Sequence, residues 1–525
     1  MTTGKNNQDI LLSGLRLIEA SAGTGKTHKI IELFIRLILE KELTVDQILV
    51  VTFTEAATEE LRDRIRKALR AKKVELSIED IAPENKKNIL LLQNALINFD
   101  EAAIFTIHGF CFRILKEQAY ESSSLFDTEL ITDQDHLLQE TLDDFWRKNF
   151  YNLSPAFAAY ALQANYSSEG FLKLFSGQLQ NPLLKIIPDD TEPEINTAET
   201  PFKLAYAEAS DSWHKNNEEI KTLFMTSNSL KQNIYKKESI PKWAAEFDNF
   251  FSGESPSIIF PEKLIKLTPS ELEKGTKKGG TPPGHTFFYL CENLIEKSNA
   301  LTAFFDRRLL SLKKDLLKNA GTTLKQKKAH HNVLYFDDLL FNVYYALDGS
   351  EGSHFAEKIR NKYRAALIDE FQDTDPIQYK IFKKLFIHKN TCLFLIGDPK
   401  QAIYSFRGAD IYTYMHAAAS AAANSHHTLA VNYRSNHGLV KAVNTIFSLV
   451  QAPFVFDEIA FQPVSSSAQQ NNEYLAIDNQ EKAPFVLWFF DRSQADRDSG
   501  KGEKKPPQPI SKNLAQQRII TAEIG

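Results

Sequence analysis

The chain has 525 residues, more than one ordinary domain of about 100–200 residues accommodates. With 43% hydrophobic and 25% charged residues, and few glycines (21) and prolines (20), it has the composition of a helix-rich globular protein, which excludes a mainly disordered or collagen-like chain. The net charge of −5 excludes a wholly basic nucleic-acid coat but permits a local basic groove.

The first 120 residues predict strands and helices in alternation. Short apolar runs, such as ILVVTF at 48–53, are typical of strands buried on both faces. Apolar residues at helical spacing follow the first run, and a charged helical segment follows the second. The expected strands are 15–19, 48–53 and 102–107, and the expected helices are about 30–38, about 55–73 and from about 109. This alternation indicates a parallel sheet.

Residues 125–330 interrupt this pattern. Their apolar residues recur mostly at helical spacing with polar interruptions, so we expect a helical insertion that splits one α/β core. Between Arg307 and Lys328, eight basic side chains accompany a single acid, Asp315. Such a run is either a solvated helix face or a face that contacts phosphates.

The alternation of strands and helices resumes in the last third of the chain. Further strands are expected at 365–368, 392–396 and 428–431, with helices between them. From about residue 446 we expect a further unit, with apolar strands such as 485–490 and a linker at 492–509 that is rich in Lys, Gly, Asp and Pro.

The segment ASAGTGKT at 20–27 is the strongest chemical signal. It stands between an expected strand and an expected helix, where small residues let main-chain N–H groups approach a phosphate and the helix dipole favours an anion. In such a Walker A loop Lys26 reaches the β- and γ-phosphates and Thr27 ligates Mg²⁺. The predicted nucleotide-binding residues are Ala20, Ser21, Ala22, Gly23, Thr24, Gly25, Lys26 and Thr27. Ala20 stands where the usual pattern has its first Gly.

Two acids close the strand expected at 365–368. Asp369 and Glu370 would then lie at the carboxyl edge of the sheet, where the ligands of α/β folds bind. There Asp369 would hold Mg²⁺, and Glu370 would orient or deprotonate the attacking water. An ordinary exposed strand end explains the pair equally well by itself, but the Walker A loop upstream favours the catalytic interpretation.

Two later segments carry candidate residues, each with a structural alternative. Gln401 follows the next strand, where it would contact the γ-phosphate or the attacking water. Tyr404 and Phe406, in a polar stretch that ends at Arg407, either stack on unpaired bases or fill the core. Arg434 follows the last expected strand and is either an arginine finger or one half of a salt bridge between a loop and a helix.

These motifs, in this order, closely resemble those of superfamily 1 DNA helicases of the UvrD/Rep type. The matching segments are 20–27, 52–58 (TFTEAAT), 106–111 (TIHGFC), 368–378 (IDEFQDTDPIQ), 396–410 (IGDPKQAIYSFRGAD) and 431–435 (VNYRS). Details such as FTIHGFC from Phe105 and GADIYTYM from Gly408 resemble one branch of that family, the RecB subunits of bacterial exodeoxyribonuclease V, or RecBCD. The likeness covers nearly the whole chain, but the insertion only loosely.

The resemblance implies a fold: a RecA-like P-loop core with a parallel sheet, split by a large helical insertion, and the start of a second RecA-like domain. The implied domains are a first motor domain from 1–120 and 335–445, the insertion at 125–330, and an incomplete second motor domain at 446–525. The implied cofactors are ATP and Mg²⁺, with Glu370, Gln401 and Arg434 catalytic and Tyr433 stacked on adenine. The residues implied in the single-strand track and its coupling to ATP are Thr52, Phe53, His108, Tyr404, Phe406 and Arg407.

By the same resemblance, the function is that of an ATP-driven 3′→5′ DNA translocase and helicase in double-strand-break repair and homologous recombination. The implied partners are single-stranded DNA, duplex DNA ends, and RecC-like and RecD-like subunits. Two alternatives remain: a P-loop ATPase that only switches, and a fragment that binds ATP and DNA without productive hydrolysis. The second alternative follows from the expectation that the later helicase motifs and the nuclease domain are absent from these 525 residues.

The predicted compartment is the bacterial cytoplasm. Cys111, Cys291 and Cys392 lie far apart and form neither a metal-binding spacing nor a plausible disulfide framework, which fits a reducing environment. The N-terminus is polar and no run approaches the ~18 apolar residues of a membrane span, so we expect neither a signal peptide nor a membrane contact.

Overall fold

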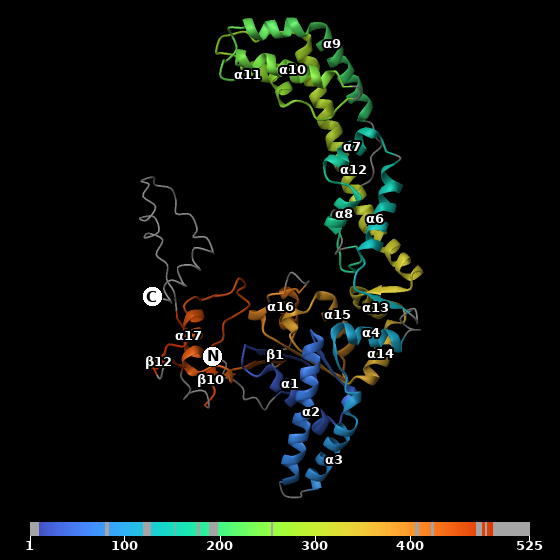
Figure 1. Ribbon diagram of the computed structural model, residues 1–525, viewed down its shortest axis with the longest axis vertical. Helices are drawn as coiled ribbons and strands as arrows, with labels where there is room; N and C mark the ends of the chain where they lie inside the picture. The colour runs from blue at the N-terminus through green and yellow to red at the C-terminus, as the bar shows by residue number, and fades with distance from the viewer. Residues whose placement is uncertain are drawn as a thin grey trace. The chain divides into compact units, whose positions relative to one another are not determined.

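The chain forms two compact units, each with a core of its own. The computed structural model describes residues 10–78, 83–118, 128–151, 153–175, 179–187, 198–253, 256–404, 409–421, 425–468, 475–477 and 480–486. The first unit comprises Met1–Ser124 with Asn342–Gly525, and the second is Leu125–Phe341. The first unit thus combines both ends of the chain, and Figure 1 shows its blue N-terminal elements among orange C-terminal ones.

A six-stranded parallel sheet forms the centre of the first unit. Its strands are β1 (Gly14–Ala20), β2 (Ile48–Thr52), β3 (Ile104–Thr106), β6 (Ala365–Ile368), β7 (Cys392–Gly397) and β8 (His426–Leu429). They are ordered β3-β2-β6-β7-β1-β8, and all neighbouring pairs are parallel. In this order β6 and β7, which follow the insertion, lie between β2 and β1, which precede it, so the chain leaves the sheet after β3 and returns to its middle. The predicted α/β core is confirmed.

Helices cover both faces of this sheet because its inner strands are apolar on both sides. All residues of β2, β6 and β7 are buried. Ile48 and Val50 share a core with the apolar stripe of α1, and the alternate residues of β2 face the other side. The helices of this unit are α1 (Lys26–Lys41), α2 (Glu55–Ile78), α3 (Pro83–Ile97), α4 (Ile107–Glu117), α14 (Gly352–Lys362), α15 (Pro376–Phe386), α16 (Ile411–Ser420) and α17 (His437–Ser448).

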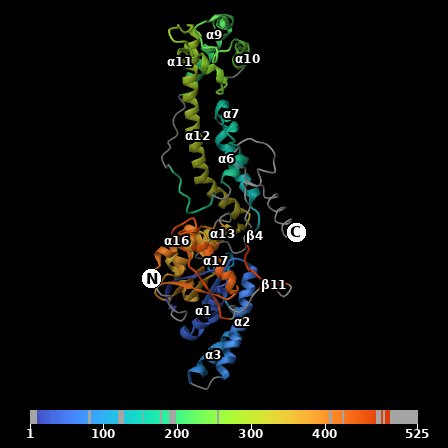
Figure 2. The same ribbon diagram turned by 90° about the vertical axis from the view of Figure 1, so that its left-hand side faces the viewer.

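The second unit is helical and is built along one long helix. Its helices are α6 (Asp135–Phe150), α7 (Pro155–Gln163), α8 (Ser168–Phe175), α9 (Glu199–Thr226), α10 (Ile240–Phe251), α11 (Pro269–Lys274) and the 45-residue α12 (Thr286–His330). Figure 2 shows α12 running along this unit, with α9, α10 and α11 around one end. A two-stranded parallel sheet joins β4 (Glu129–Ile131) to β5 (Val333–Tyr335). Helix α13 (Phe336–Asp348) begins in the second unit and ends in the first.

The basic run at 307–328 lies on α12, and three of its eight basic side chains contribute to the packing of the second unit. Lys327 forms ion pairs with Glu140 and Asp144 of α6, at 2.8 and 2.6 Å. Lys328 is buried and pairs with Asp338 at 2.7 Å, and Lys314 is also buried. The interpretation as a solvated helix face is therefore wrong for these three lysines. For Lys327 and Lys328, the acidic neighbours pair the charge and so allow the side-chain stem to be buried.

Several predicted element boundaries are wrong. The third strand is only Ile104–Thr106, because Thr106 caps α4 by accepting a hydrogen bond from Gly109 N, so the helix begins at Ile107. The strand expected at 428–431 is divided into β8 and a separate strand β9 (Val431–Asn432), which pairs with β10 (Ser465–Ser466). Of the strand expected at 485–490, Phe485 and Val486 lie outside any strand, and the remainder lies outside the described residues. A short antiparallel pair, β11 (Leu475–Ile477) and β12 (Gln480–Lys482), precedes it.

None of the described helices is both long enough and apolar enough to cross a membrane.

Candidate nucleotide-binding site and adjoining cleft

The phosphate loop runs from the end of β1 to the start of α1. Gly23 and Gly25 have φ of 78° and 90°, the left-handed region that favours glycine. A Cβ at Gly23 would lie 2.8 Å from Asn432 Nδ2, so glycine is also needed there for space. Thr24 is buried, and its hydroxyl donates to the Ser21 carbonyl over 2.7 Å. Ala20 is the last residue of β1, an extended position that a Cβ suits, so its substitution for the usual glycine is accommodated.

A second segment, residues 432–435, closes one side of this loop. Asn432 Nδ2 donates to the Ala22 carbonyl over 2.9 Å, and Tyr433 N donates to the Gly23 carbonyl over 2.8 Å. Asn432 Oδ1 in turn accepts from the main-chain N–H groups of Arg434 and Ser435, both at 2.9 Å. Tyr433 is 57% exposed. The predicted adenine-stacking and arginine-finger residues therefore flank the loop, and Asn432, which the sequence did not single out, holds them there.

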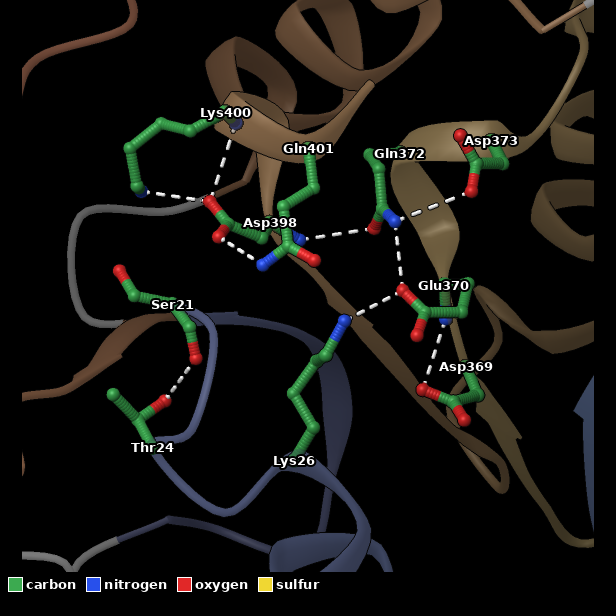
Figure 3. A network of polar contacts seen from close by, with 10 residues as sticks. All are labelled: Ser21, Thr24, Lys26, Asp369, Glu370, Gln372, Asp373, Asp398, Lys400 and Gln401. Atoms are coloured by element: carbon green, nitrogen blue, oxygen red, sulfur yellow. Dashed lines mark hydrogen bonds and ion pairs between the residues drawn. The ribbon is translucent and has the colours of Figure 1, made fainter. Parts of the chain in front are cut away.

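The two acids after β6 face the lysine of the phosphate loop. Lys26 Nζ lies 2.6 Å from Glu370 Oε2, although β7 separates their two strands in the sheet (Figure 3). Glu370 N donates to Asp369 Oδ1 over 2.9 Å. The carboxyl edge of a parallel sheet thus brings together the Walker A lysine and the acid pair, the arrangement that the spacing of the motifs predicted.

Burial controls the ionisation of Asp369. Burial, together with the neighbouring charge of Glu370, raises the pKa of Asp369 to about 6, while the charge of Lys26 opposes this shift. A cation bound at this carboxylate would relieve both effects. Among the described residues there is no group of three or more His, Cys, Asp or Glu side chains that could hold a metal ion. One carboxylate and the hydroxyl of Thr27, with oxygens from a bound phosphate, are the ligand set that Mg²⁺ commonly takes.

A network of polar contacts continues from Glu370 to the end of β7 (Figure 3). Gln372 Nε2 donates to Glu370 Oε2 over 2.7 Å, and Gln372 Oε1 accepts from Asp398 N over 2.9 Å. The Asp398 carboxylate accepts from Gln401 Nε2 over 2.6 Å and pairs with Lys400 at 2.8 Å. Lys400 also pairs with Glu19 at the end of β1. Apart from Glu370 and Gln401, the sequence did not single out these residues, because only the sheet order brings the ends of β1, β6 and β7 together.

One cleft connects these catalytic candidates to an aromatic pair. Phe53 and Tyr404 are half-buried, and their rings stack with centroids 6.5 Å apart and an interplanar angle of 15°. The cleft is lined by Thr52, Phe53, Thr54, Ala57, Asp369, Glu370, Gln372, Asp373, Lys400, Gln401, Ile403 and Tyr404. The structure therefore places the predicted single-strand residues Thr52, Phe53 and Tyr404 beside the acid pair.

Of the remaining predicted DNA contacts, the structure describes only His108. His108 is half-buried in the first turn of α4 and does not line this cleft. Thr106, the residue that caps α4, donates from its hydroxyl to Glu55 Oε1 over 3.1 Å and so ties the start of α4 to the start of α2. Phe406 and Arg407 lie outside the described residues.

Comparison with known proteins places these features in a family. Residues 2–422 match the UvrD/REP helicase N-terminal domain. The chain is 35% identical over 503 residues to the RecBCD enzyme subunit RecB of Escherichia coli, and 34% identical over 523 residues to that of Haemophilus influenzae. These alignments cover 91% and 88% of this chain but only 42% of either relative, so the chain spans less than half the length of the curated relatives it matches. The match over most of the chain, together with the sheet order and the phosphate loop, shows that the chain belongs to the UvrD/REP helicase family.

Proposed function

We propose that the chain is an ATP-driven motor of the RecB type, which moves 3′→5′ along single-stranded DNA and separates duplex DNA. The observation that carries this proposal is the single cleft that holds both the acid pair facing Lys26 and the Phe53–Tyr404 stack. In a motor the ATP site and the strand-binding site must be coupled, because binding at one site changes the binding free energy at the other. A shared cleft provides a direct path for this coupling.

The nucleotide would bind on the phosphate loop. Main-chain N–H groups of the loop and Lys26 would hold the phosphates, and Tyr433 would stack on the adenine. Glu370 would orient and deprotonate the attacking water, with Gln401 contacting the γ-phosphate and Arg434 neutralising its developing charge. Bound Mg²⁺, held by Thr27 and Asp369, would supply additional neutralisation of the phosphate oxygens.

The strand would lie over the aromatic pair. A half-exposed ring offers a face to any base, and each stacked base contributes ~1–3 kcal/mol without reading sequence. The interpretation of Tyr404 as core filler is disfavoured because its ring lines the open cleft. We further propose that His108, Phe406 and Arg407 extend this track.

We also propose a division into domains. Residues 1–120 with 335–445 would form the first motor domain, residues 125–330 the insertion, and residues 446–525 the start of a second motor domain.

The proposed setting follows from the relatives. Their names assign them to the RecBCD enzyme, so we propose RecC-like and RecD-like partner subunits, duplex DNA ends as substrate, and a role in double-strand-break repair and recombination in the bacterial cytoplasm.

Titration with a fluorescent ATP analogue and Mg²⁺ tests the nucleotide site. We expect Lys26→Ala to weaken binding at least tenfold, since a lost charge-assisted hydrogen bond costs about 1.5–3 kcal/mol. Lys41→Ala, which removes an exposed charge from the last turn of the same helix, is the matched control and should bind like the wild type. Unchanged affinity in Lys26→Ala, with an unchanged melting temperature, would refute the assignment of the phosphate loop.

Hydrolysis measured with and without a single-stranded oligonucleotide separates the motor from a switch. A motor should hydrolyse ATP faster when the strand is bound, because strand contact and Glu370 share the cleft. A rate that is indifferent to the oligonucleotide would favour a P-loop switch.

A further inference from the structure

Gln372 is a buried amide that joins two segments of the site. It lies in η5 (Phe371–Asp373), the short turn that follows Glu370, and only 2% of it is exposed. One end of the amide donates to Glu370 Oε2 and the other accepts from Asp398 N (Figure 3). A single side chain therefore connects the end of β6 with the end of β7.

The donor end of Gln372 controls the orientation of Glu370. Oxygen Oε2 of Glu370 receives two hydrogen bonds, from Lys26 at 2.6 Å and from Gln372 at 2.7 Å. Hydrogen bonds to an ionised group are short and strongly directional, so the pair fixes the plane of the carboxylate. If Lys26 turns to a phosphate, as the proposed function requires, Gln372 is the donor that still holds this oxygen.

The acceptor end of Gln372 controls the start of the segment 398–404. Its partner Asp398 holds Gln401 by a 2.6 Å hydrogen bond across η6 (Pro399–Gln401). Three residues after Gln401, Tyr404 stacks on Phe53. The segment 398–404 and Gln372 thus form a continuous path of contacts from Tyr404 through Asp398 to Glu370.

The side chain of Gln372 packs against Gly397 without room for a larger residue there. A Cβ at Gly397 would lie 2.5 Å from Gln372 Oε1 and 3.1 Å from Gln372 N. Gly397 is a strand residue outside the left-handed region, so its main chain does not require glycine. Space for the amide of Gln372 is the reason for glycine at this position.

We propose that Gln372 is a positioning residue that couples the strand at Phe53 and Tyr404 to the orientation of Glu370. The proposal rests on the proposed function and deepens it: Gln372 lines the cleft and acts there through its hydrogen bonds to Glu370 and Asp398. Replacing the Gln372 amide should leave the affinity for the nucleotide alone and for the strand alone nearly unchanged. It should abolish the effect of bound nucleotide on the affinity for the strand.

The test is a coupling measurement on the full chain. The affinity for a fluorescent single-stranded oligonucleotide is measured with and without Mg²⁺ and a non-hydrolysable ATP analogue. For the wild type, we expect the two affinities to differ by about fivefold or more. Gln372→Met keeps the volume and removes the hydrogen bonds of the amide to Glu370, Asp373 and Asp398. In this variant the ratio of the two affinities should fall to within about twofold of one, and each ligand alone should bind within about threefold of its wild-type affinity.

Two further variants make the result specific. Gly397→Ala keeps the amide of Gln372 but displaces it, and should also bring the ratio close to one. Gln378→Met removes another buried amide nearby, one that accepts from Asp375 N in the cap of α15 and has no contact with Glu370, and should keep the wild-type ratio. Gly397→Ala also provides the test if Gln372→Met does not fold.

A wild-type ratio that persists in folded Gln372→Met or Gly397→Ala overturns the proposal, as does a ratio of one in the wild type. A wild-type chain that binds no nucleotide rejects the proposed function as well, and this outcome is visible before any variant is made.

Discussion

Glu370 is held in an uncommon backbone conformation. Its φ of 51° lies in the left-handed region, where a residue other than glycine is strained. Three groups surround its side chain or main chain: Lys26, Gln372 and Asp369. Backbone strain is retained where neighbouring contacts determine the geometry, so this turn is built to direct one carboxylate rather than to minimise its own energy.

Glu370→Gln tests the assigned role of that carboxylate. The amide keeps the size of the side chain but cannot accept a proton, so ATP turnover should fall by about 10²–10⁴-fold. Affinity for Mg²⁺ and an ATP analogue should stay within a few-fold of wild type. Steady-state hydrolysis and equilibrium titration measure the two effects separately. Glu351→Gln, at an exposed residue just before α14, is the control, and wild-type turnover in Glu370→Gln would move the catalytic role to another residue.

Asp373 predicts a dependence of stability on pH. Burial, with the charge of Glu370, raises the pKa of Asp373 to about 6, and Oδ1 has no hydrogen-bond partner in the part of the chain that the structure describes. The unfolded chain has the ordinary pKa of about 3.9, so the folded state binds this proton more tightly. The ionised carboxylate therefore costs stability above about pH 6, and this cost disappears below about pH 4.

Asp373→Asn should remove that cost. We expect the free energy of unfolding in urea to rise by about 1–2 kcal/mol at pH 7.5, and the gain to shrink as the pH falls from 6 to 4. A gain of equal size at all pH values would show that the ionisation of Asp373 is not its cause.

The sequence predicted the residues of the site that belong to a known chemical pattern, and missed those that act through the fold. Lys26, Asp369 and Glu370 follow from local motifs, because a strand end fixes where such side chains project. Gln372 and Asn432 act through partners 26 and 410 residues away, and such contacts depend on strand order. Neighbouring strands in a parallel sheet are not specified by the periodicity of either strand.

At the scale of elements, the junction of α12 and α13 depends on one buried ion pair. Lys328 Nζ donates to Asp338 at 2.7 Å and to Gln180 at 2.8 Å, and Asp338 Oδ2 also accepts from Tyr335 N at 2.7 Å. Asp338, an acid in the first turn of α13, therefore has a structural role. Burial lowers the pKa of Lys328, against the attraction of Asp338, so the charge is retained only because it is paired.

Lys328→Met should destabilise the chain by about 3–5 kcal/mol, since it leaves the Asp338 carboxylate buried and unpaired. Adding Asp338→Asn should recover part of the loss, because the amide is neutral and still accepts from Tyr335 N. Urea unfolding followed by circular dichroism measures both. If the double variant is less stable than Lys328→Met, the pair is not the source of the effect.

Strands β2, β6 and β7 were predictable because each is an apolar run with both faces buried. Residues 48–51, 365–368 and 392–396 are buried throughout. The division of the run 428–431 into β8 and β9 was not predictable, because Val431 and Asn432 pair with Ser465 and Ser466, a partner strand that has no apolar pattern.

At the scale of the whole molecule, the second unit has the features of an independent domain. Among the residues that the structure describes, its hydrophobic core runs from Leu138 to Leu324, and the β4–β5 pair joins its two ends. Residues 125–341 expressed alone should therefore fold, with a helical circular-dichroism spectrum and a cooperative thermal transition. A spectrum with helical signal but no cooperative melt would show that the first unit is needed to order this core.

Strands made early in synthesis pair with strands made late, and this order has a consequence for biosynthesis. β2 pairs with β6, whose first residue, Ala365, is 317 positions after Ile48. At about 5–20 residues per second on the ribosome, this partner is made about 16–60 s after β2. During that time β3 can pair with one edge of β2, but the other edge of β2 and both edges of β1 have no partner strand and are open to aggregation. The helical unit at 125–341, which is made before β6, can already fold. The yield of native chain should thus depend on chaperones that protect a nascent half-sheet rather than on the stability of the finished protein.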